Sequence, residues 1–168
     1  KGAGHKVVIL KPEYDENHLP VASSLIELFA TVTKLMRDKK VAAAYTPTYG
    51  GVAEAVLKMA MGNRIGFAYN KDLTNDDIFG YNYGAFVLEL TEDVTVGEVL
   101  GNTTEDYAIS YGAEKICMCE LEELYENKLE SIFKCNIKRE EKKIEKYEYK
   151  CADVKKSSVK IAKPKVLI

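Results

Sequence analysis

The chain has 168 residues, of which 46% are hydrophobic and 30% are charged, a composition typical of one globular domain with a core of useful size. Its 24 basic and 26 acidic residues give a formal net charge of -2, which argues against nucleic-acid binding and against attraction to an anionic membrane. No apolar run has the length of a transmembrane helix and the N-terminus lacks a signal-peptide pattern, so we expect a cytoplasmic protein without a membrane partner.

The first third of the chain predicts a strand, a helix and a second strand. The apolar run at 6–10 is typical of a short buried strand, which Pro12 ends. Hydrophobic residues then recur at helical spacing from about Pro20 to Arg37, with basic residues at the C-terminal end, where the helix dipole favours them. The run Val41–Tyr45 predicts another short buried strand.

A segment with the sequence TPTYGG, Thr46–Gly51, follows that strand. Apolar residues behind it have helical spacing: Val52, Ala55, Val56, Met59 and Ala60. The helix is therefore expected to begin at or next to Gly51 and to end at Gly62. The predicted unit is a strand, a Gly-Gly turn and a helix.

The middle of the chain predicts mainly strands. They are expected at 64–69, 85–90, 94–100, 107–111 and 115–121, with a polar loop at 70–83 and a helix at 121–129. Strands and helices do not alternate strictly, so the expected fold class is α+β. We predict helices that pack on a mixed, largely antiparallel sheet.

The C-terminal part has a different composition. Residues 138–150 are dense in charges of both signs, which is typical of a solvated helix or a linker. Residues 165–168 form a strand-like apolar run at the end of the chain. We expect a domain at 1–137, a charged connector at 138–164 and, at 165–168, the first strand of a further domain. The start at Lys1, without Met, suggests a piece of a longer protein.

The cysteines and histidines do not have the clustered spacing of a zinc site. They are Cys117, Cys119, Cys135, Cys151, His5 and His18. We predict no metal site and interpret the cysteines as reduced, small buried hydrophobic residues, with the first two on one face of a strand. A Cys-His nucleophilic pair could form in space, but no local pattern indicates one.

The Gly-Gly turn is the candidate ligand site. Gly50 and Gly51 let backbone approach a ligand closely, and free amides at a helix start favour an anion such as phosphate. Thr46, Thr48 and the hydroxyl of Tyr49 would be its polar neighbours. The alternative is a tight turn without a ligand, and from the residues alone it is the favoured interpretation, because neither a P-loop lysine pattern nor G-x-G-x-x-G is present.

Two neighbouring features have simpler interpretations. Glu54 stands one turn into the helix. We interpret it as a surface carboxylate that is stabilised by the positive end of the helix, rather than as a catalytic base. The segment Gly80–Gly84, with the sequence GYNYG, is a glycine-bounded loop that we expect to pack its own tyrosines.

Four stretches resemble a known family when they are taken in order. They are VAAAYTPTYGGVAEAVLKMAMGNRIGF (41–67), YGAFVLEL (83–90), ELEELYENKLESIF (120–133) and KPKVLI (163–168). Together they resemble the second synthetase-type C-terminal domain of phosphoribosylformylglycinamidine synthase. The last stretch is similar to the junction with that enzyme's glutaminase domain, whose first strand would begin at about Lys165.

The resemblance implies an α/β sandwich, a sheet covered by helices, like the C-terminal domain of aminoimidazole ribonucleotide synthetase. It implies participation in the ATP- and glutamine-dependent amidation of formylglycinamide ribonucleotide in purine biosynthesis. ATP and magnesium would be bound mainly by a missing N-terminal half. The partners would be the N-terminal synthetase domains and the glutaminase domain of the same chain, with small-molecule nucleotides as substrates. We expect the isolated piece to carry no cofactor and no catalytic residue, and to be inactive.

Family members often have Asp-Gly-Gly before the helix, whereas here Tyr49 precedes the glycines. Of that family motif, only Gly50 and Gly51 match. Together with Thr46 and Thr48, we expect them to hold a phosphate without acid-base or metal chemistry. One alternative is a structural or regulatory nucleotide-binding scaffold half of the same protein. Another is a relative such as thiamine monophosphate kinase or selenophosphate synthetase, which the KPKVLI junction disfavours because those proteins have no glutaminase extension.

Overall fold

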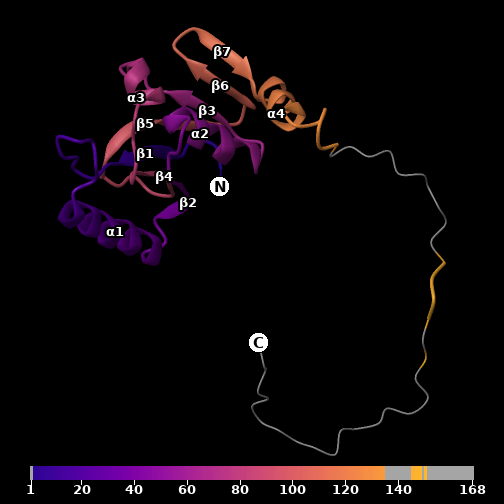
Figure 1. The fold of residues 1–168 in the computed structure, drawn as a ribbon, viewed down its shortest axis with the longest axis horizontal. Coiled ribbons are helices and arrows are strands. Elements are labelled where there is room, and N and C mark those ends of the chain that lie inside the picture. The colour runs from indigo at the N-terminus through magenta and orange to yellow at the C-terminus, as the bar shows by residue number, and fades with distance from the viewer. Residues whose placement is uncertain (1, 135–144, 149, 151–168) are drawn as a thin grey trace, which may run out of the picture. The chain divides into compact units, whose positions relative to one another are not determined.

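The structure, a computed structural model, describes residues 2–134, 145–148 and 150 (Figure 1). Residues 1–134 make up one compact unit. Its elements follow one another as β1 (Lys6–Leu10), α1 (Ala22–Arg37), β2 (Val41–Tyr45), α2 (Gly51–Met61), β3 (Gly66–Tyr69), α3 (Asn75–Phe79), β4 (Phe86–Leu90), β5 (Glu98–Thr104), β6 (Ala108–Tyr111), β7 (Glu114–Cys117) and α4 (Met118–Asn127).

The strands form one seven-stranded sheet in the order β2-β4-β1-β5-β3-β6-β7. Neighbouring strands are antiparallel except for β3 and β6, which are parallel. The sheet is therefore mixed and largely antiparallel, and the predicted α+β class is confirmed. None of the helices in the described part of the chain is long and apolar enough to cross a membrane.

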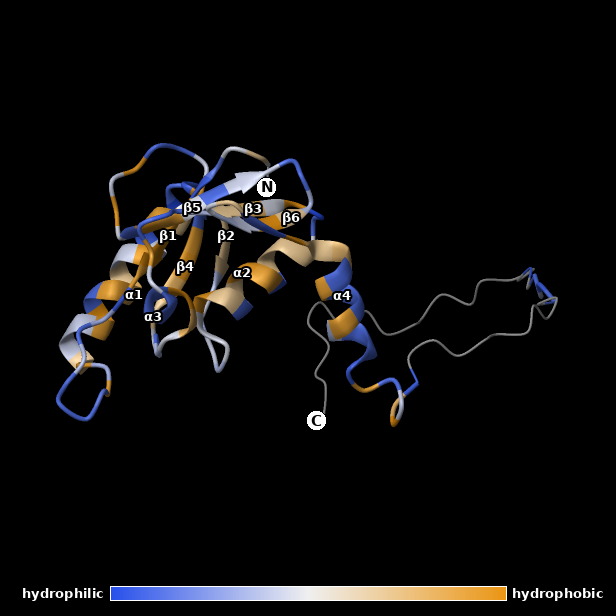
Figure 2. Cartoon of the chain, turned by 90° about the horizontal axis from the view of Figure 1, so that it is seen from above, coloured by the Kyte–Doolittle hydropathy of each residue, from blue (hydrophilic) through white to orange (hydrophobic). Residues whose placement is uncertain are grey.

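Two buried clusters lie on opposite faces of this sheet. Along β1, Val7 and Ile9 belong to the cluster that includes α2, whereas Val8 and Leu10 belong to the cluster that includes α1. This division follows from the strand itself, because successive side chains point to opposite faces. Figure 2 shows α1 and α2 on opposite sides of β4. The predicted sandwich is thus a sheet with helices on both faces.

The long helix α1 is amphipathic, as its sequence predicts. Leu28, Val32 and Leu35 are buried against β1 and β4, while Lys34 and Arg37 lie in the last turn. The apolar residues repeat every three to four positions, which places them on one face of a helix. The helix begins at Ala22, two residues after Pro20.

Two predictions for the middle of the chain were wrong in detail. The segment 70–83, predicted as a loop, contains the short helix α3. The strand predicted at 94–100 lies at Glu98–Thr104 instead. Val94 and Val96 do pack against the core on the α1 side, so the apolar pattern identified partly buried residues correctly. It did not identify the backbone pairing of β5 with β1 and β3, which depends on tertiary neighbours.

The prediction that Cys117 and Cys119 are buried on one face of a strand was also wrong, although both are free thiols as expected. The strand predicted to reach residue 121 ends at Cys117, because the fully buried Met118 begins α4. Cys117 and Cys119 therefore do not share a strand, and both are exposed rather than buried. Cys135, Cys151 and the strand expected at 165–168 lie outside the described residues, as does most of the charged connector. Residues 145–148 and 150 of that connector have no helix or strand.

Candidate functional site

The sheet brings two loops together at one end. β2 and β4 are antiparallel neighbours, with Tyr45 opposite Val87. The segment that leaves β2 is the glycine turn 46–50, and the segment that enters β4 is the tyrosine-rich stretch 79–84. Because the end of one antiparallel strand lies beside the start of the other, these two loops meet at the same end of the sheet.

Gly51 is required by the packing of α2 against the end of α3 and the residue that follows it. Its φ is 64°, and a Cβ atom at this position would lie 2.9 Å from the carbonyl oxygen of Ile78 and 3.0 Å from that of Gly80. Any larger residue would combine an unfavourable backbone conformation with a clash. The amide of Gly51 donates to the carbonyl of Thr48 at 3.1 Å. The Gly-Gly pair is thus a tight turn as well as a helix start.

The Glu54 carboxylate binds the donors of this turn. Its Oε2 atom accepts hydrogen bonds from the Thr48 hydroxyl at 2.7 Å and from the Gly50 amide at 2.8 Å. Its Oε1 atom accepts from the Lys58 ammonium at 2.5 Å, one helical turn further on. These hydrogen bonds, of which that with Lys58 has the largest effect, lower the pKa of Glu54 to about 2. An anion therefore already occupies the position at which the sequence predicts a phosphate.

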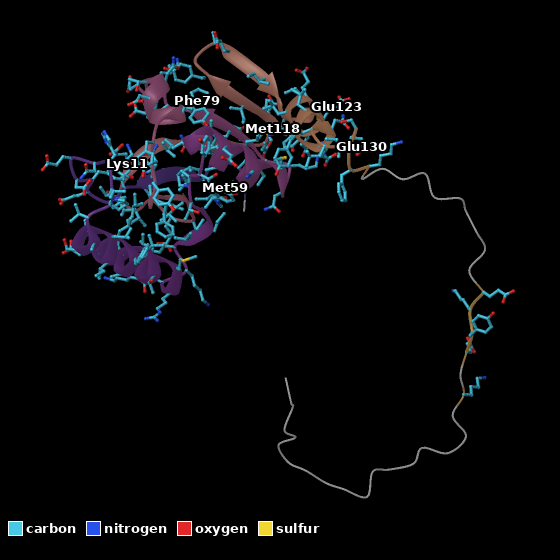
Figure 3. The ribbon with its side chains drawn as sticks, in the orientation of Figure 1. Lys11, Met59, Phe79, Met118, Glu123 and Glu130 are labelled. Carbon is cyan, nitrogen blue, oxygen red and sulfur yellow. The ribbon has the colours of Figure 1, made fainter. Side chains whose placement is uncertain are left out.

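An open pocket of about 660 Å³ lies beside the turn. Its lining consists of Thr48 and Tyr49 on one side and the stretch 79–83 on the other. Tyr49 is fully exposed, and Phe79, labelled in Figure 3, is 65% exposed. The pocket thus joins Thr48 of the predicted site to a wall of aromatic rings.

The tyrosines of this wall contact one another. The rings of Tyr81 and Tyr83 are stacked with centroids 6.1 Å apart, and Tyr14 meets Tyr81 edge to face at 5.8 Å. The Tyr14 hydroxyl donates to the backbone carbonyl of Tyr83 at 2.9 Å. Burial raises the pKa of Tyr14, so it remains a neutral hydrogen-bond donor. The prediction that this loop packs its own aromatics agrees with the stacked pair, but the sequence did not indicate that the loop lines a pocket.

Helix α3 fixes the aromatic wall in place. Thr74 and Asp77 form a capping box, in which the Thr74 hydroxyl accepts from the Asp77 amide and the Asp77 carboxylate accepts from the Thr74 amide. At the other end, the Gly80 amide donates to the Asp76 carbonyl at 2.8 Å. The buried Asn82 then donates to the Gly80 carbonyl at 3.2 Å. The loop is therefore held by its own hydrogen bonds.

The structure brings three of the four predicted site residues together. Thr48, Gly50 and Gly51 form the turn around Glu54, whereas Thr46 is exposed and its side chain makes no hydrogen bond to any described residue. Sequence reasoning missed the role of Glu54, although its spacing of four residues to both Gly50 and Lys58 was a usable signal.

The chemistry available at the site is binding rather than proton transfer. It offers a hydroxyl, backbone amides, the Lys58 ammonium and aromatic faces, while Glu54 is held in its charged form. Within the described ranges, no group of three or more His, Cys, Asp or Glu side chains could hold a metal ion. Such donors suit a phosphate, and exposed aromatic rings suit a planar or apolar part of a ligand.

No protein-family model matches the chain. Solved structures do resemble it. Phosphoribosylformylglycinamidine synthase II from Thermotoga maritima matches with a TM-score of 0.54 and 14% sequence identity over 72% of this chain. T. maritima PurL complexed with ATP gives a TM-score of 0.53 and 14% identity, also over 72%. T. maritima PurL complexed with FGAR gives 0.56 and 12%, again over 72%.

At these identities the similarity shows the fold alone. The mixed sheet with its helices is therefore a PurL-like fold. The chain spans 26% of the length of the first two neighbours and 28% of the third, so it corresponds to about a quarter of those proteins.

Proposed function

We propose that this chain is the second synthetase-type C-terminal domain of a phosphoribosylformylglycinamidine synthase. In the intact protein it serves the ATP- and glutamine-dependent amidation of formylglycinamide ribonucleotide in purine biosynthesis. Three features support this assignment: the ordered family-like stretches of sequence, the PurL-like fold, and the pocket at the predicted turn. The last carries the proposal, because a turn singled out by its sequence lines an open pocket next to hydrogen-bond donors.

Within that pocket, the Thr48 hydroxyl and the amides at the start of α2 hold the phosphate of a ribonucleotide. Glu54 then acts as an internal substitute for the phosphate, since it accepts from the same donors in this structure. A phosphate that enters displaces the carboxylate and gains the Lys58 ammonium as a partner. Thr46 is assigned to the outer rim of this site.

The chain alone is catalytically silent under this proposal. Phosphoryl transfer needs several converging charges and metal ions, and one turn of amides and a hydroxyl supplies only a part of them. The missing N-terminal half binds most of the ATP and magnesium, and the missing glutaminase domain supplies ammonia. ATP turnover by the isolated chain would contradict this point.

A second candidate is a structural or regulatory scaffold half of the same protein, whose turn contacts no reactant. One observation favours it: Glu54 already satisfies the Thr48 hydroxyl and the Gly50 amide. Under this candidate the carboxylate is a permanent part of the turn.

Reconstitution distinguishes the two candidates. The chain is combined with the missing synthetase and glutaminase domains. Glutamine-dependent ATP hydrolysis is then measured at increasing concentrations of formylglycinamide ribonucleotide (FGAR). A hydrogen bond to a charged group contributes about 1.5–3 kcal/mol, so Thr48→Val should raise the KM for FGAR by about 10-fold or more. Thr33→Val, on the exposed face of α1, is the matched control and should leave the KM unchanged.

An unchanged KM for Thr48→Val would favour the scaffold candidate. Failure of the wild-type mixture to hydrolyse ATP, under conditions in which the intact protein works, would contradict the ligase assignment itself.

A further inference from the structure

Two exposed thiols lie at the junction of β7 and α4, on the part of the sheet that carries β6 and β7. Cys117 is the last residue of β7, and its backbone is extended. Met118 begins α4 and is fully buried, and its amide donates to the carbonyl of Tyr107 at 3.2 Å. Figure 3 labels Met118 at this junction. The buried residue anchors the chain and leaves the cysteines on either side of it at the surface.

The change from strand to helix shortens the distance between the two cysteines. Two residues of extended strand span at most about 7 Å between Cα atoms, whereas disulfides need roughly 4.4–6.8 Å. Here the extended conformation stops at Cys117 and helical conformation begins at Met118, so the backbone turns between the two. The Cys117 side chain lies close enough to the Cys119 thiol to raise its pKa. They are therefore placed to react with each other.

Arg64 gives the two thiols different surroundings. Its Nη2 atom donates to the Sγ atom of Cys119 at 3.7 Å. The guanidinium lies over the ring of Tyr107, 4.6 Å from its centroid, and its Nη1 atom is 3.6 Å from Oε2 of Glu122. The Tyr107 hydroxyl in turn donates to Glu122. The aromatic ring and the carboxylate thus hold the guanidinium against one thiol of the pair.

These neighbours act on the Cys119 thiol in opposite directions. The pKa of Cys119 is raised overall, mainly by the contact with Cys117 and by burial, whereas the Arg64 guanidinium acts to lower it. A positive charge beside sulfur stabilises the thiolate, which is the form that attacks a disulfide. We assign the first attack to Cys119 because the Arg64 guanidinium contacts its sulfur directly.

We propose that Cys117 and Cys119 form an oxidisable dithiol that closes to an intramolecular disulfide by exchange with a small-molecule disulfide. The Cys119 thiolate attacks one sulfur of that disulfide, forms a mixed disulfide and releases one thiolate. The Cys117 thiolate then attacks the Cys119 sulfur, forms the internal S–S bond and releases the second thiolate. The two protons of the protein thiols pass to the released thiolates. Two protein thiols are oxidised and one external disulfide is reduced.

The closed form would link the end of β7 to the first turn of α4. That helix packs against β6, β7 and α2, so the bond would restrain its first turn on the sheet. The site is distinct from the turn around Glu54 and does not depend on the function proposed above.

Trypsin provides a direct test, because it releases residues 116–128 as one peptide with both cysteines and no other. The full chain with Cys135→Ser and Cys151→Ser is treated with oxidised glutathione, alkylated and analysed by mass spectrometry. We expect this peptide to lose two hydrogen atoms, to resist alkylation and to regain two reactive thiols after dithiothreitol. A peptide that keeps two free thiols, or that accumulates only the glutathione adduct, would overturn the proposal.

Single variants test the order of the two steps. Cys117→Ser should stop at a glutathione adduct on Cys119, whereas Cys119→Ser should form its adduct on Cys117 several-fold more slowly. Arg64→Gln should slow disulfide formation several-fold, and Arg64→Lys should restore part of the rate, with unchanged circular dichroism in both. Equal adduct rates for the two cysteine variants, or no effect of Arg64→Gln, would overturn the assigned order of attack.

Discussion

Glu54 couples the stability of the glycine turn to pH. Its pKa is about 2 in the folded chain, compared with an ordinary value of 4.5, because it accepts from Lys58, Thr48 and Gly50. Since the folded pKa is lower than the unfolded one, the stabilisation is complete above about pH 4.5 and is lost as the pH falls toward 2.

We therefore predict that wild-type protein loses stability more steeply than Glu54→Gln across this window. Urea denaturation at several pH values measures the two slopes. Asp77 also has a lowered pKa, through its hydrogen bonds with Thr74, so some slope remains in the variant and the difference between the proteins is the informative quantity. Identical slopes would contradict the role assigned to Glu54.

Gly51 offers a second prediction at a single residue, with a matched control elsewhere in the chain. Gly51→Ala places a methyl group 2.9 Å from a backbone oxygen, whereas at Gly112 the φ is almost the same, at 61°, and nothing lies within 4 Å. A positive φ costs about 1–2 kcal/mol for alanine and overpacking costs a further ~1–3 kcal/mol.

Gly51→Ala should thus lower the free energy of unfolding by about 2–5 kcal/mol and Gly112→Ala by only about 1–2 kcal/mol. Chemical denaturation measures both. Equal losses would show that the backbone approach at Ile78 and Gly80 does not restrict residue 51.

The element that shapes the pocket wall is the short helix α3, which depends on its cap. Loss of an N-cap hydroxyl typically costs about 1 kcal/mol, so Thr74→Ala should lower the free energy of unfolding by about that amount. Its effect should be largest on hydrogen exchange of the amides at 78–82, which span the end of α3 and the loop after it. Thr33→Ala, on the exposed face of α1, should leave both quantities nearly unchanged. Unaltered exchange at 78–82 in Thr74→Ala would contradict the role given to the cap.

The local pattern of apolar residues was sufficient to predict some helices and strands and insufficient to predict others. α1 and α2 were predictable because their apolar residues repeat at helical spacing, and β1 and β2 because short apolar runs lie between turn residues. The helix α3 has five residues with only Ile78 buried, so its sequence carries little periodicity. Its Thr74-x-x-Asp77 capping box was the signal that could have identified it.

At the scale of the whole molecule, the candidate site depends on strand order. Residues 51–78 separate the two loops that line the pocket, and the loops meet because β2 lies next to β4 in antiparallel orientation. Local patterns in a single sequence do not reveal that strand order. The turn at Thr48 could therefore be predicted as a ligand site, whereas the tyrosine wall could not.

The most direct test of the central claim is a nuclear magnetic resonance titration of the chain with FGAR, compared with its dephosphorylated riboside. If the turn holds a phosphate, saturable amide shifts should appear at 48–53 and at 79–83 with FGAR and should be much weaker with the riboside. Shifts of equal size with both compounds, or saturable shifts confined to other parts of the chain, would contradict phosphate binding at this turn.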